Sequence, residues 1–364
     1  MGMKRFHLAA FAGVSAVLIQ GLVLPAISWG APPSPALRKS DREPVAGRCG
    51  DLVAPGRADD YTGDLVLHNE REAAAYVHVK TLHGSLTIAP EGPVTISLPA
   101  LQTVTGAVDI SVLLFPAATQ VSSACGLGEV LDYVQSQAYL PALATIGGTL
   151  RVEQQPTELG LTVHSSYGHL VDLGLPALTD LGGDLQVIFG SGWTSACGLP
   201  ALSEVPHDVL LSLGPQDHTG LGLLGALTQV GGSLTLDGGF TVSGVLPALQ
   251  TVDGSTWVTG NGQLIFPALA YDMGELVIDH LRPEVSGLHV VLGYASDPIT
   301  VGGLTLTDNP SLTSLATGGA LRLALGAQLH VSGNPMLSGA EVCAFVAEQE
   351  ALGWVPAGTG FICP

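Results

Sequence analysis

The sequence predicts an all-β solenoid, a right-handed parallel β-helix closed by a C-terminal capping helix. Three observations support this prediction. A unit written LPALATIGGTLRV at 140–152 recurs in similar form at 98–110, 175–187 and 224–236. The apolar residues that end each unit alternate with polar ones, which is typical of a strand with one buried face. The units mostly recur about every 20 to 25 residues, a period at which each coil buries its leucines only against neighbouring coils.

The chain begins with a segment unlike the rest. A basic pair, Lys4 and Arg5, precedes an apolar run of about 17 residues and then small residues. This layout predicts a secretory signal peptide at residues 1–30, with an uncleaved membrane anchor as the alternative. Residues 31–60 are interpreted as a Pro-rich linker and N-terminal cap. No second stretch approaches the ~20 apolar residues that a membrane-spanning helix needs, so we expect a secreted or cell-surface protein.

Solenoid repeats are expected over residues 61–337. Aligned on the small residue before each alternating segment, eleven copies are found, some degenerate, beginning at Thr62, His83, Thr105, Gly147, Gly182, Pro206, Gly231, Asp253, Met273, Gly302 and Gly326. The glycines that open most copies are expected to allow tight turns with positive φ. The preceding LPAL element is expected to send both leucines into the core, with its proline fixing the bend. Strands from successive coils should then pair in parallel into one long sheet.

Residues 338–364 contain the clearest helical pattern, followed by a short tail. Ser338 is the predicted N-cap, with Glu341 three residues on, as in a capping box. One helical face is expected to carry Val342, Phe345, Val346 and Gln349. Cys343 lies on this helix and Cys363 follows it, so we expect a disulfide that fastens the cap over the last coil.

Charge and cysteine content exclude several classes of function. The formal net charge is −19 at pH 7, and it becomes −21 if Lys4 and Arg5 leave with the signal peptide. That balance argues against nucleic acid and anionic membrane surfaces as partners. None of the five cysteines forms a CxxC pair, which argues against zinc. Cys125 could pair with Cys197 if their coils are adjacent, and the odd count leaves at least one cysteine, such as Cys49, free or paired between chains.

The pattern LPAL…V.GxLxI, with DNPSLTSL at 308–315 and SGNPMLSGAEVCAFV at 332–346, resembles receptor L-domain repeats. These are the leucine-rich-repeat-like β-helices of insulin and EGF receptor ectodomains, and similar repeats occur in secreted bacterial and fungal cell-wall proteins. The resemblance covers roughly residues 60–364 and implies architecture more than function. The chain departs from the family in having asparagine-ladder residues only in places, at Asn69, Asn309 and Asn334. It also lacks the disulfide-rich modules and kinase region of animal receptors, so no receptor role is carried over.

Motifs for catalysis or cofactors are weak. No HExxH, nucleophile elbow, P-loop, EF-hand or helix-opening GxGxxG is present. We therefore expect no catalytic residues, metal or cofactor. The alternative function is an extracellular carbohydrate-active enzyme, a polysaccharide hydrolase or lyase, that uses Asp237 and Asp279. If coils stack in register, two strand spacings separate these carboxylates by roughly 9.6 Å, near the upper end of the range for inverting glycosidases.

A binding face is expected on the outward side of the strands. By the alternation in DGSTWVTGNG, Trp257 points outward, beside Thr235, Asp237, Val277 and Asp279. An outward aromatic among polar residues is typical of a sugar-stacking or protein-binding platform. The alternative is a register slip of one residue that places Trp257 in the core. We therefore expect a non-catalytic binding or structural protein of the cell envelope with a protein or glycan partner.

Overall fold

The computed structural model describes residues 59–116, 133–135, 137–155, 169–172, 174–189, 193–218, 223–240, 246–260, 271–272, 274–281, 287, 298–317 and 321–354. The chain divides into two units, residues 1–52 and 53–364, and all described residues belong to the second. The predicted signal peptide, almost all of the predicted linker, and Cys49, Cys125 and Cys363 lie outside the described residues.

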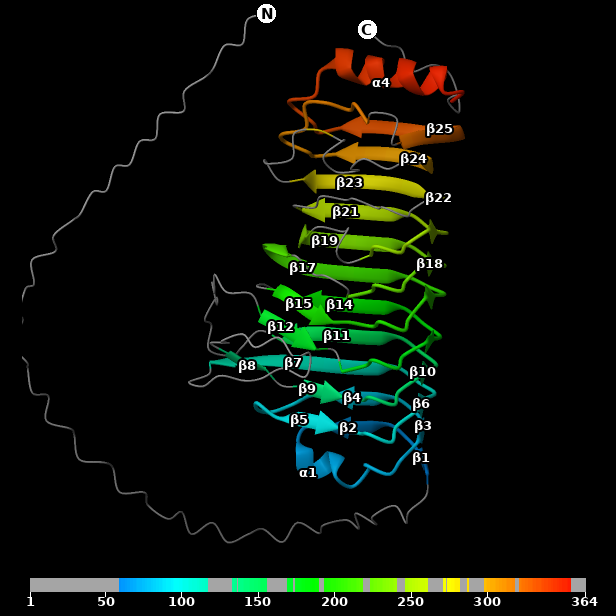
Figure 1. Ribbon diagram of the computed structural model, residues 1–364. Coiled ribbons are helices and arrows are strands. Elements are labelled where there is room, and N and C mark those ends of the chain that lie inside the picture. The colour runs from blue at the N-terminus through cyan, green and yellow to red at the C-terminus, as the bar shows by residue number, and fades with distance from the viewer. Residues whose placement is uncertain are drawn as a thin grey trace, which may run out of the picture. The chain divides into compact units, whose positions relative to one another are not determined.

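A parallel sheet runs the length of the second unit (Figure 1). Its strands, in spatial order, are β2 (Leu65–Leu67), β4 (Leu86–Ile88), β7 (Val108–Pro116), β11 (Leu150–Gln155), β14 (Leu185–Phe189), β17 (Val209–His218), β19 (Leu234–Phe240), β21 (Thr256–Gly260), β23 (Glu275–Leu281), β24 (Ile299–Thr307) and β25 (Leu321–Ser332). A twelfth strand, β8 (Tyr133–Gln135), pairs antiparallel with β7. Each of the other strands pairs with its neighbours in parallel, which confirms the predicted parallel all-β stack.

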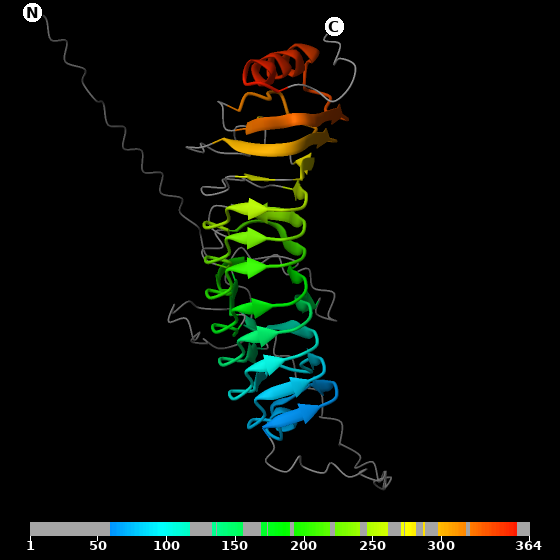
Figure 2. The same cartoon turned by 90° about the vertical axis from the view of Figure 1, so that its right-hand side faces the viewer.

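The prediction of a single sheet is incomplete, because a second sheet lines another side of the coils (Figure 2). It is built from short strands that follow the LPAL element. One segment contains β1 (Asp60–Thr62), β3 (Thr81–His83), β6 (Thr103–Val104), β10 (Thr145–Ile146) and β13 (Asp180–Leu181). The other contains β16 (Glu204–Val205), β18 (Gln229–Val230), β20 (Thr251–Val252) and β22 (Tyr271–Asp272). Two smaller parallel pairs join β5 (Thr95–Ser97) to β9 (Gln137–Tyr139) and β12 (His169–Asp172) to β15 (Trp193–Cys197).

The core is a continuous column of leucine, isoleucine and valine. Both leucines of the LPAL-type elements are buried in every described copy, as at Leu140 and Leu143. The inward residues of the main sheet stack on one another, for example Leu150 on Leu185. Coils that share side chains in this way depend on their neighbours for burial.

Most glycines of the turns serve a different purpose from the predicted one. In most coils a glycine lies two residues before the first inward residue of the main-sheet strand, as Gly63 lies before Leu65. Among the described glycines at this position, only Gly63 has positive φ. The others allow coils to stack closely: a Cβ on Gly84 would lie 2.3 Å from the Gly63 carbonyl oxygen, and one on Gly254 would lie 2.7 Å from Gly232. Close approach of backbone to backbone therefore explains most of the repeated glycines, and the predicted positive φ is found at Gly63 and at Gly326, which opens the last copy.

The side chains just before the first inward strand residue form a column of hydrogen bonds between successive coils. The side chain of Asp64 accepts a hydrogen bond from the backbone N–H of Ser85, at 2.8 Å. The Asp208 carboxylate accepts a hydrogen bond from the Ser233 N–H at 2.7 Å. The Ser233 hydroxyl oxygen accepts one from the Ser255 N–H at 3.4 Å. An Asp or Ser between the glycine and the strand thus satisfies an N–H of the next coil.

Helix α4 (Gly339–Ala351) closes the stack beside β25 (Figure 1). Ser338 is its N-cap and accepts a hydrogen bond from the Glu341 N–H, as predicted, whereas the Glu341 carboxylate accepts one from Ser314. Gln349 is fully buried; it accepts from the Leu323 N–H at 3.0 Å and donates to the Leu321 carbonyl at 3.2 Å. The expected face is confirmed, with Phe345 and Val346 buried and Val342 packed partly against the core.

Cys343 of α4 is disulfide-bonded. Its predicted partner, Cys363, lies outside the described residues, so this pairing stays a prediction. Cys197 ends β15, and its predicted pairing with Cys125 also stays untested.

Candidate functional site

Trp257 points out of the main sheet. It is 45% exposed, whereas its neighbours Thr256 and Val258 are buried, so the outward orientation is confirmed and the register slip is not observed. Parallel pairing places Thr235 of β19 and Val277 of β23 on either side of it. Trp257 is thus an exposed aromatic side chain on a β-sheet face, in the position predicted from the alternation.

A second outward column runs beside Trp257 and carries the two predicted aspartates. Asp237 of β19 pairs with Thr259 of β21, which pairs with Asp279 of β23. The two carboxylates therefore flank Thr259, two strand spacings apart, as the sequence predicted. We call Thr235, Asp237, Trp257, Thr259 and Asp279 the Trp257 face.

Hydroxyl groups hold both carboxylates of the Trp257 face. Asp237 accepts hydrogen bonds from Ser212 at 3.1 Å and from Thr259 at 2.6 Å, one on each carboxylate oxygen. Asp279 accepts one from Thr307 at 2.9 Å. These hydrogen bonds fix the orientation of both carboxylates beside an aromatic ring.

Val277 lies on the outward face predicted for it, but it is buried. It occupies the outward column next to Trp257, yet it is only 3% exposed. It also lies outside the main hydrophobic core cluster. Its burial therefore arises on the outer side of the sheet, where Trp257 and Thr305 are its neighbours in register. The predicted outward position of Val277 is therefore confirmed by the register. Its burial could not be predicted, because alternation gives the face of a side chain but not what covers it.

Asp279 forms an ion pair with the next residue, His280, at 2.8 Å. Partial burial raises the pKa of Asp279, but hydrogen bonds from His280 and Thr307 and the charge of His280 outweigh it, so the net shift is downward. The hydrogen bond to Asp279, and then its charge, raise the pKa of His280 above its usual value. The pair is therefore ionised on both sides over a wider pH range than either group alone.

The backbone at His280 is left-handed. His280 has φ 51° and Asp308, at the equivalent position of the next coil, has φ 50°. Glycines with positive φ occupy this position in three other coils: Gly238, Gly260 and Gly333. Non-glycine residues tolerate this region poorly, and His and Asp are among those that adopt it most often. A column of left-handed residues thus terminates the strands beside the Trp257 face.

Asp279, His280 and Asp308 are the described residues that could hold a metal ion. Their ligand atoms all lie within 4.8 Å of one another, and they offer one imidazole nitrogen and two carboxylate oxygens. The sequence analysis missed this grouping, because His280 and Asp308 become neighbours only through the register of β23 and β24. Exposed acidic groups of this kind are common without a metal, so the expected absence of a metal is left as an expectation.

Two of the predicted asparagine-ladder residues stack. Asn309 is buried, accepts a hydrogen bond from the Leu281 N–H at 3.0 Å and donates to the Ile278 carbonyl at 3.0 Å. Asn334 of the next coil accepts from the Asn309 N–H and donates to the Leu306 carbonyl. Asn69 instead caps the short helix α1 (Glu70–Ala73). The ladder therefore supports the backbone directly behind the left-handed column.

Comparison of the chain with protein-family models, curated proteins and solved structures found no match. Among the described residues, no helix is both long and apolar enough to cross a membrane.

Proposed function

We propose that the protein is a non-catalytic, secreted or cell-surface binding protein of the cell envelope, which presents the Trp257 face to a protein or glycan partner. The observation that carries the proposal is the 45% exposure of Trp257 beside a column of two hydrogen-bonded carboxylates, Asp237 and Asp279. An exposed tryptophan supplies apolar area and a stacking surface, and fixed carboxylates supply acceptors for hydroxyl or amide donors. A solenoid sheet offers such groups at regular spacing, which suits an extended partner.

Binding is favoured over polysaccharide cleavage by the pKa of Asp279. An inverting glycosidase needs one carboxylic acid whose pKa is raised so that it stays protonated. The pKa of Asp279 is lowered, which is opposite to what the acid of such an enzyme requires. Polysaccharide turnover that is lost in Asp237→Asn or Asp279→Asn would instead support the enzyme.

The decisive variant is Trp257→Ala, measured on a glycan array and against the envelope fraction of the source organism. We expect affinity to fall by more than about 30-fold, since truncating an aromatic hot-spot side chain costs about 2 kcal/mol or more. The melting temperature should change little, because the side chain is half exposed. Tyr139→Ala is the matched control, an aromatic residue 43% exposed on another sheet. Equal binding by the wild type and Trp257→Ala would refute the proposal.

We further propose that residues 1–30 direct export, that Cys343 pairs with Cys363, and that the coils wind right-handed in the manner of receptor L-domain repeats. Right-handed winding is supported by the strong preference of parallel strand–crossover–strand connections for that hand. The repeat type is supported by the stacked Asn309 and Asn334.

A further inference from the structure

The second sheet is interrupted at one step. β13 and β16 lie in consecutive coils, but no backbone hydrogen bond joins them, so the sheet divides into two segments. On the opposite side of the same step, β14 and β17 of the main sheet pair over five residues. The two coils are therefore joined by backbone hydrogen bonds in the main sheet but not between β13 and β16.

Two residues of one repeat explain the interruption. Gly182 and Gly231, at the equivalent position of neighbouring coils, donate their N–H to the preceding coil at 2.7 and 2.8 Å. Pro206 stands at this position and has no N–H to donate. His207 follows at a position where other described coils have glycine; a Cβ on Gly183 would lie 2.6 Å from the backbone of the coil below it. The turn at 206–209 therefore lacks the backbone hydrogen bond that Gly182 and Gly231 make to the preceding coil.

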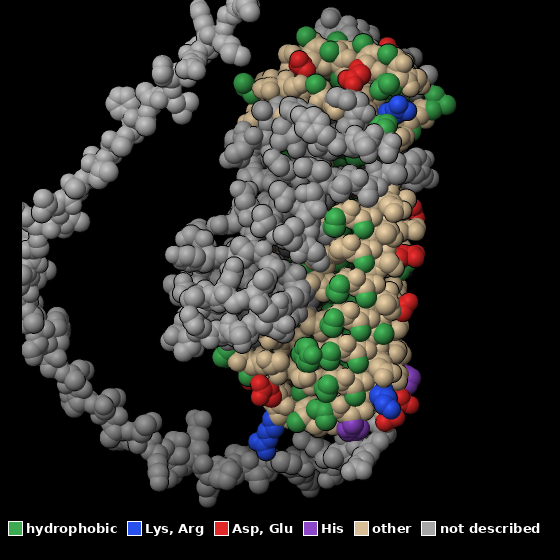
Figure 3. Space-filling view, in the orientation of Figure 1, with side chains coloured by type: hydrophobic (Ala, Val, Ile, Leu, Met, Phe, Trp, Pro, Cys, Tyr) green, Lys and Arg blue, Asp and Glu red, His purple; other side chains and the backbone are tan. Residues whose placement is uncertain are grey.

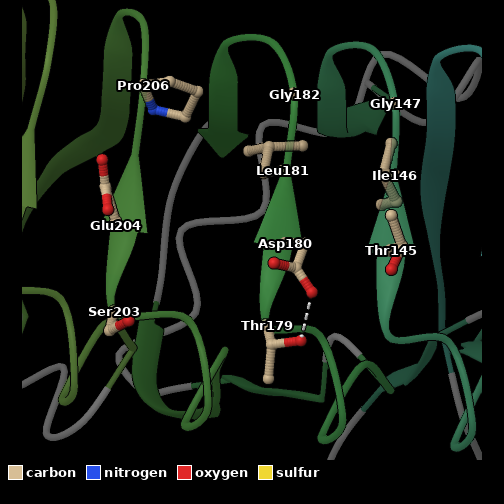
Figure 4. Close-up of a pocket in the computed structure, with 10 residues that line it drawn as sticks. All are labelled: Thr145, Ile146, Gly147, Thr179, Asp180, Leu181, Gly182, Ser203, Glu204 and Pro206. Carbon is tan, nitrogen blue, oxygen red and sulfur yellow. Dashed lines mark hydrogen bonds between the residues drawn. The ribbon is translucent and has the colours of Figure 1, made fainter.

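The interruption opens a hollow of about 360 Å³, within the size range of ligand sites. Its walls carry Asp180 on one coil and Glu204 on the next, with Thr145, Thr179 and Ser203 near them, and Ile146 and Leu181 behind (Figure 4). Thr179 donates a hydrogen bond to Asp180 at 2.7 Å. The side chain of Glu204 has no hydrogen-bond or ion-pair partner among the described residues.

The hollow is rich in acceptors and lacks cations. None of the described residues that line it is basic, and the carbonyl groups of β13 lose the donors that β16 would supply in a regular step. Acidic side chains also gather along this edge of the described surface (Figure 3). The required ligand is therefore a cation with several hydrogen-bond donors and an apolar stem.

We propose that this cleft, defined by Asp180, Leu181, Glu204 and Pro206, binds the guanidinium group of an arginine side chain from a partner protein. A guanidinium group carries five donors in one plane, which suits carboxylates on both walls and unpaired carbonyls between them. Its alkyl stem suits the ring of Pro206. The net charge of −19 attracts such a partner over a distance. This site is separate from the Trp257 face and does not depend on its function.

The test is an NMR titration of the full chain with N-acetyl-arginine amide and, as a neutral isostere, N-acetyl-citrulline amide. We expect shifts centred on the amides of Asp180, Leu181 and Glu204, with citrulline at least about tenfold weaker, as is usual for loss of a charge-assisted hydrogen bond. Glu204→Gln should weaken arginine binding at least about fivefold. Asp60→Asn is the matched control, an equal charge change at the start of the same sheet, and should leave the affinity unchanged.

A closing variant tests the cleft itself. Pro206→Gly combined with His207→Gly restores the donor and removes the Cβ, so arginine binding should disappear while the fold persists by circular dichroism. Equal binding of citrulline and arginine, or unchanged affinity in Glu204→Gln, would overturn the proposal. So would saturation of the same amides by calcium chloride without any response to arginine, which would make the cleft a metal site. The citrulline comparison uses only the wild-type chain and decides the matter even if a variant fails to fold.

Discussion

Thr256 is a polar residue in an apolar column. The inward residues before and after it in register are Leu234 and Leu276, and its own hydroxyl oxygen is buried without a hydrogen-bond partner among the described residues. A buried hydroxyl without a partner destabilises a protein, since it has lost its bonds to water. The same residue stands next to Trp257, so this cost is located directly beneath the Trp257 face.

Replacing Thr256 by valine should stabilise the chain. The substitution keeps the shape and removes the unsatisfied hydroxyl, so the free energy of unfolding should rise by about 1 kcal/mol. Urea unfolding followed by circular dichroism measures the change. Thr259→Val, which removes the hydrogen bond to Asp237, is the control and should bring no gain. A lower unfolding midpoint for Thr256→Val would show that the hydroxyl has a partner.

The ion pair of Asp279 and His280 makes a pH-dependent prediction. Because the pKa of His280 is raised in the folded state, its contribution to stability is fully present below about pH 6.5. It is lost as pH rises through the folded-state pKa. NMR titration of the His280 ring should give a midpoint above 6.5, and Asp279→Asn should lower it. A midpoint that is the same in both proteins would contradict the ion pair.

At the scale of the coil, glycine sets the stacking distance. Gly254→Ala would place a Cβ 2.7 Å from the backbone of Gly232, so the coils must separate. We expect a loss of about 1–3 kcal/mol, as for overpacked cores, measured by thermal unfolding. Gly92→Ala is the matched control, because a Cβ there meets nothing within 4 Å. Equal melting temperatures for the two variants would refute the close-approach explanation.

Gln349 of helix α4 hydrogen-bonds the backbone of the last strand. Gln349→Ala leaves a buried N–H at Leu323 and a buried carbonyl at Leu321 without their partner. Each such group costs about 1–3 kcal/mol. Hydrogen exchange at the Leu323 amide should accelerate, and the unfolding midpoint should fall. Glu350→Ala, at the exposed next position, should leave both unchanged.

The strands and the capping helix could be predicted because their signals are local. Alternation places Leu150 and Val152 inward, and Ser338 with Glu341 marks where the helix begins. The two-residue strands of the second sheet could not be predicted, since Thr145 and Ile146 are too few to show a period. The partial burial of Asp279 and the burial of Val277 depend on register and covering residues, which alternation does not encode.

At the scale of the whole molecule, stability is the sum of contacts between neighbouring coils. The step between β13 and β16 lacks one of the two hydrogen-bonded ladders, and the Asp208 N–H donates to the Asp184 carboxylate there at 3.3 Å. This step is therefore held by fewer backbone hydrogen bonds than the neighbouring steps from β10 to β13 and from β16 to β18. The sequence shows that the repeat at Pro206 is degenerate. The loss of backbone pairing there becomes clear only by comparison with the hydrogen bonds that Gly182 and Gly231 make at the equivalent position.

Unfolding should therefore divide the chain at this step. In hydrogen exchange under increasing urea, amides of β10 and β13 should lose protection at a different concentration from those of β18 and β20, because fewer contacts couple the two groups. The variant with glycine at both 206 and 207 should bring the two transitions together. A single transition shared by all amides of the wild type would contradict the division.

The same step has a mechanical consequence. In most of the stack, bending would have to stretch one ladder while compressing the other, and both resist. Between β13 and β16 only the main sheet resists, so this step acts as a compliant joint between two stiffer rods. Curvature then concentrates at one fixed position, three coils before Trp257 along the chain. A long partner laid along the main sheet would meet a surface that bends more easily at this step than at the fully paired steps beside it.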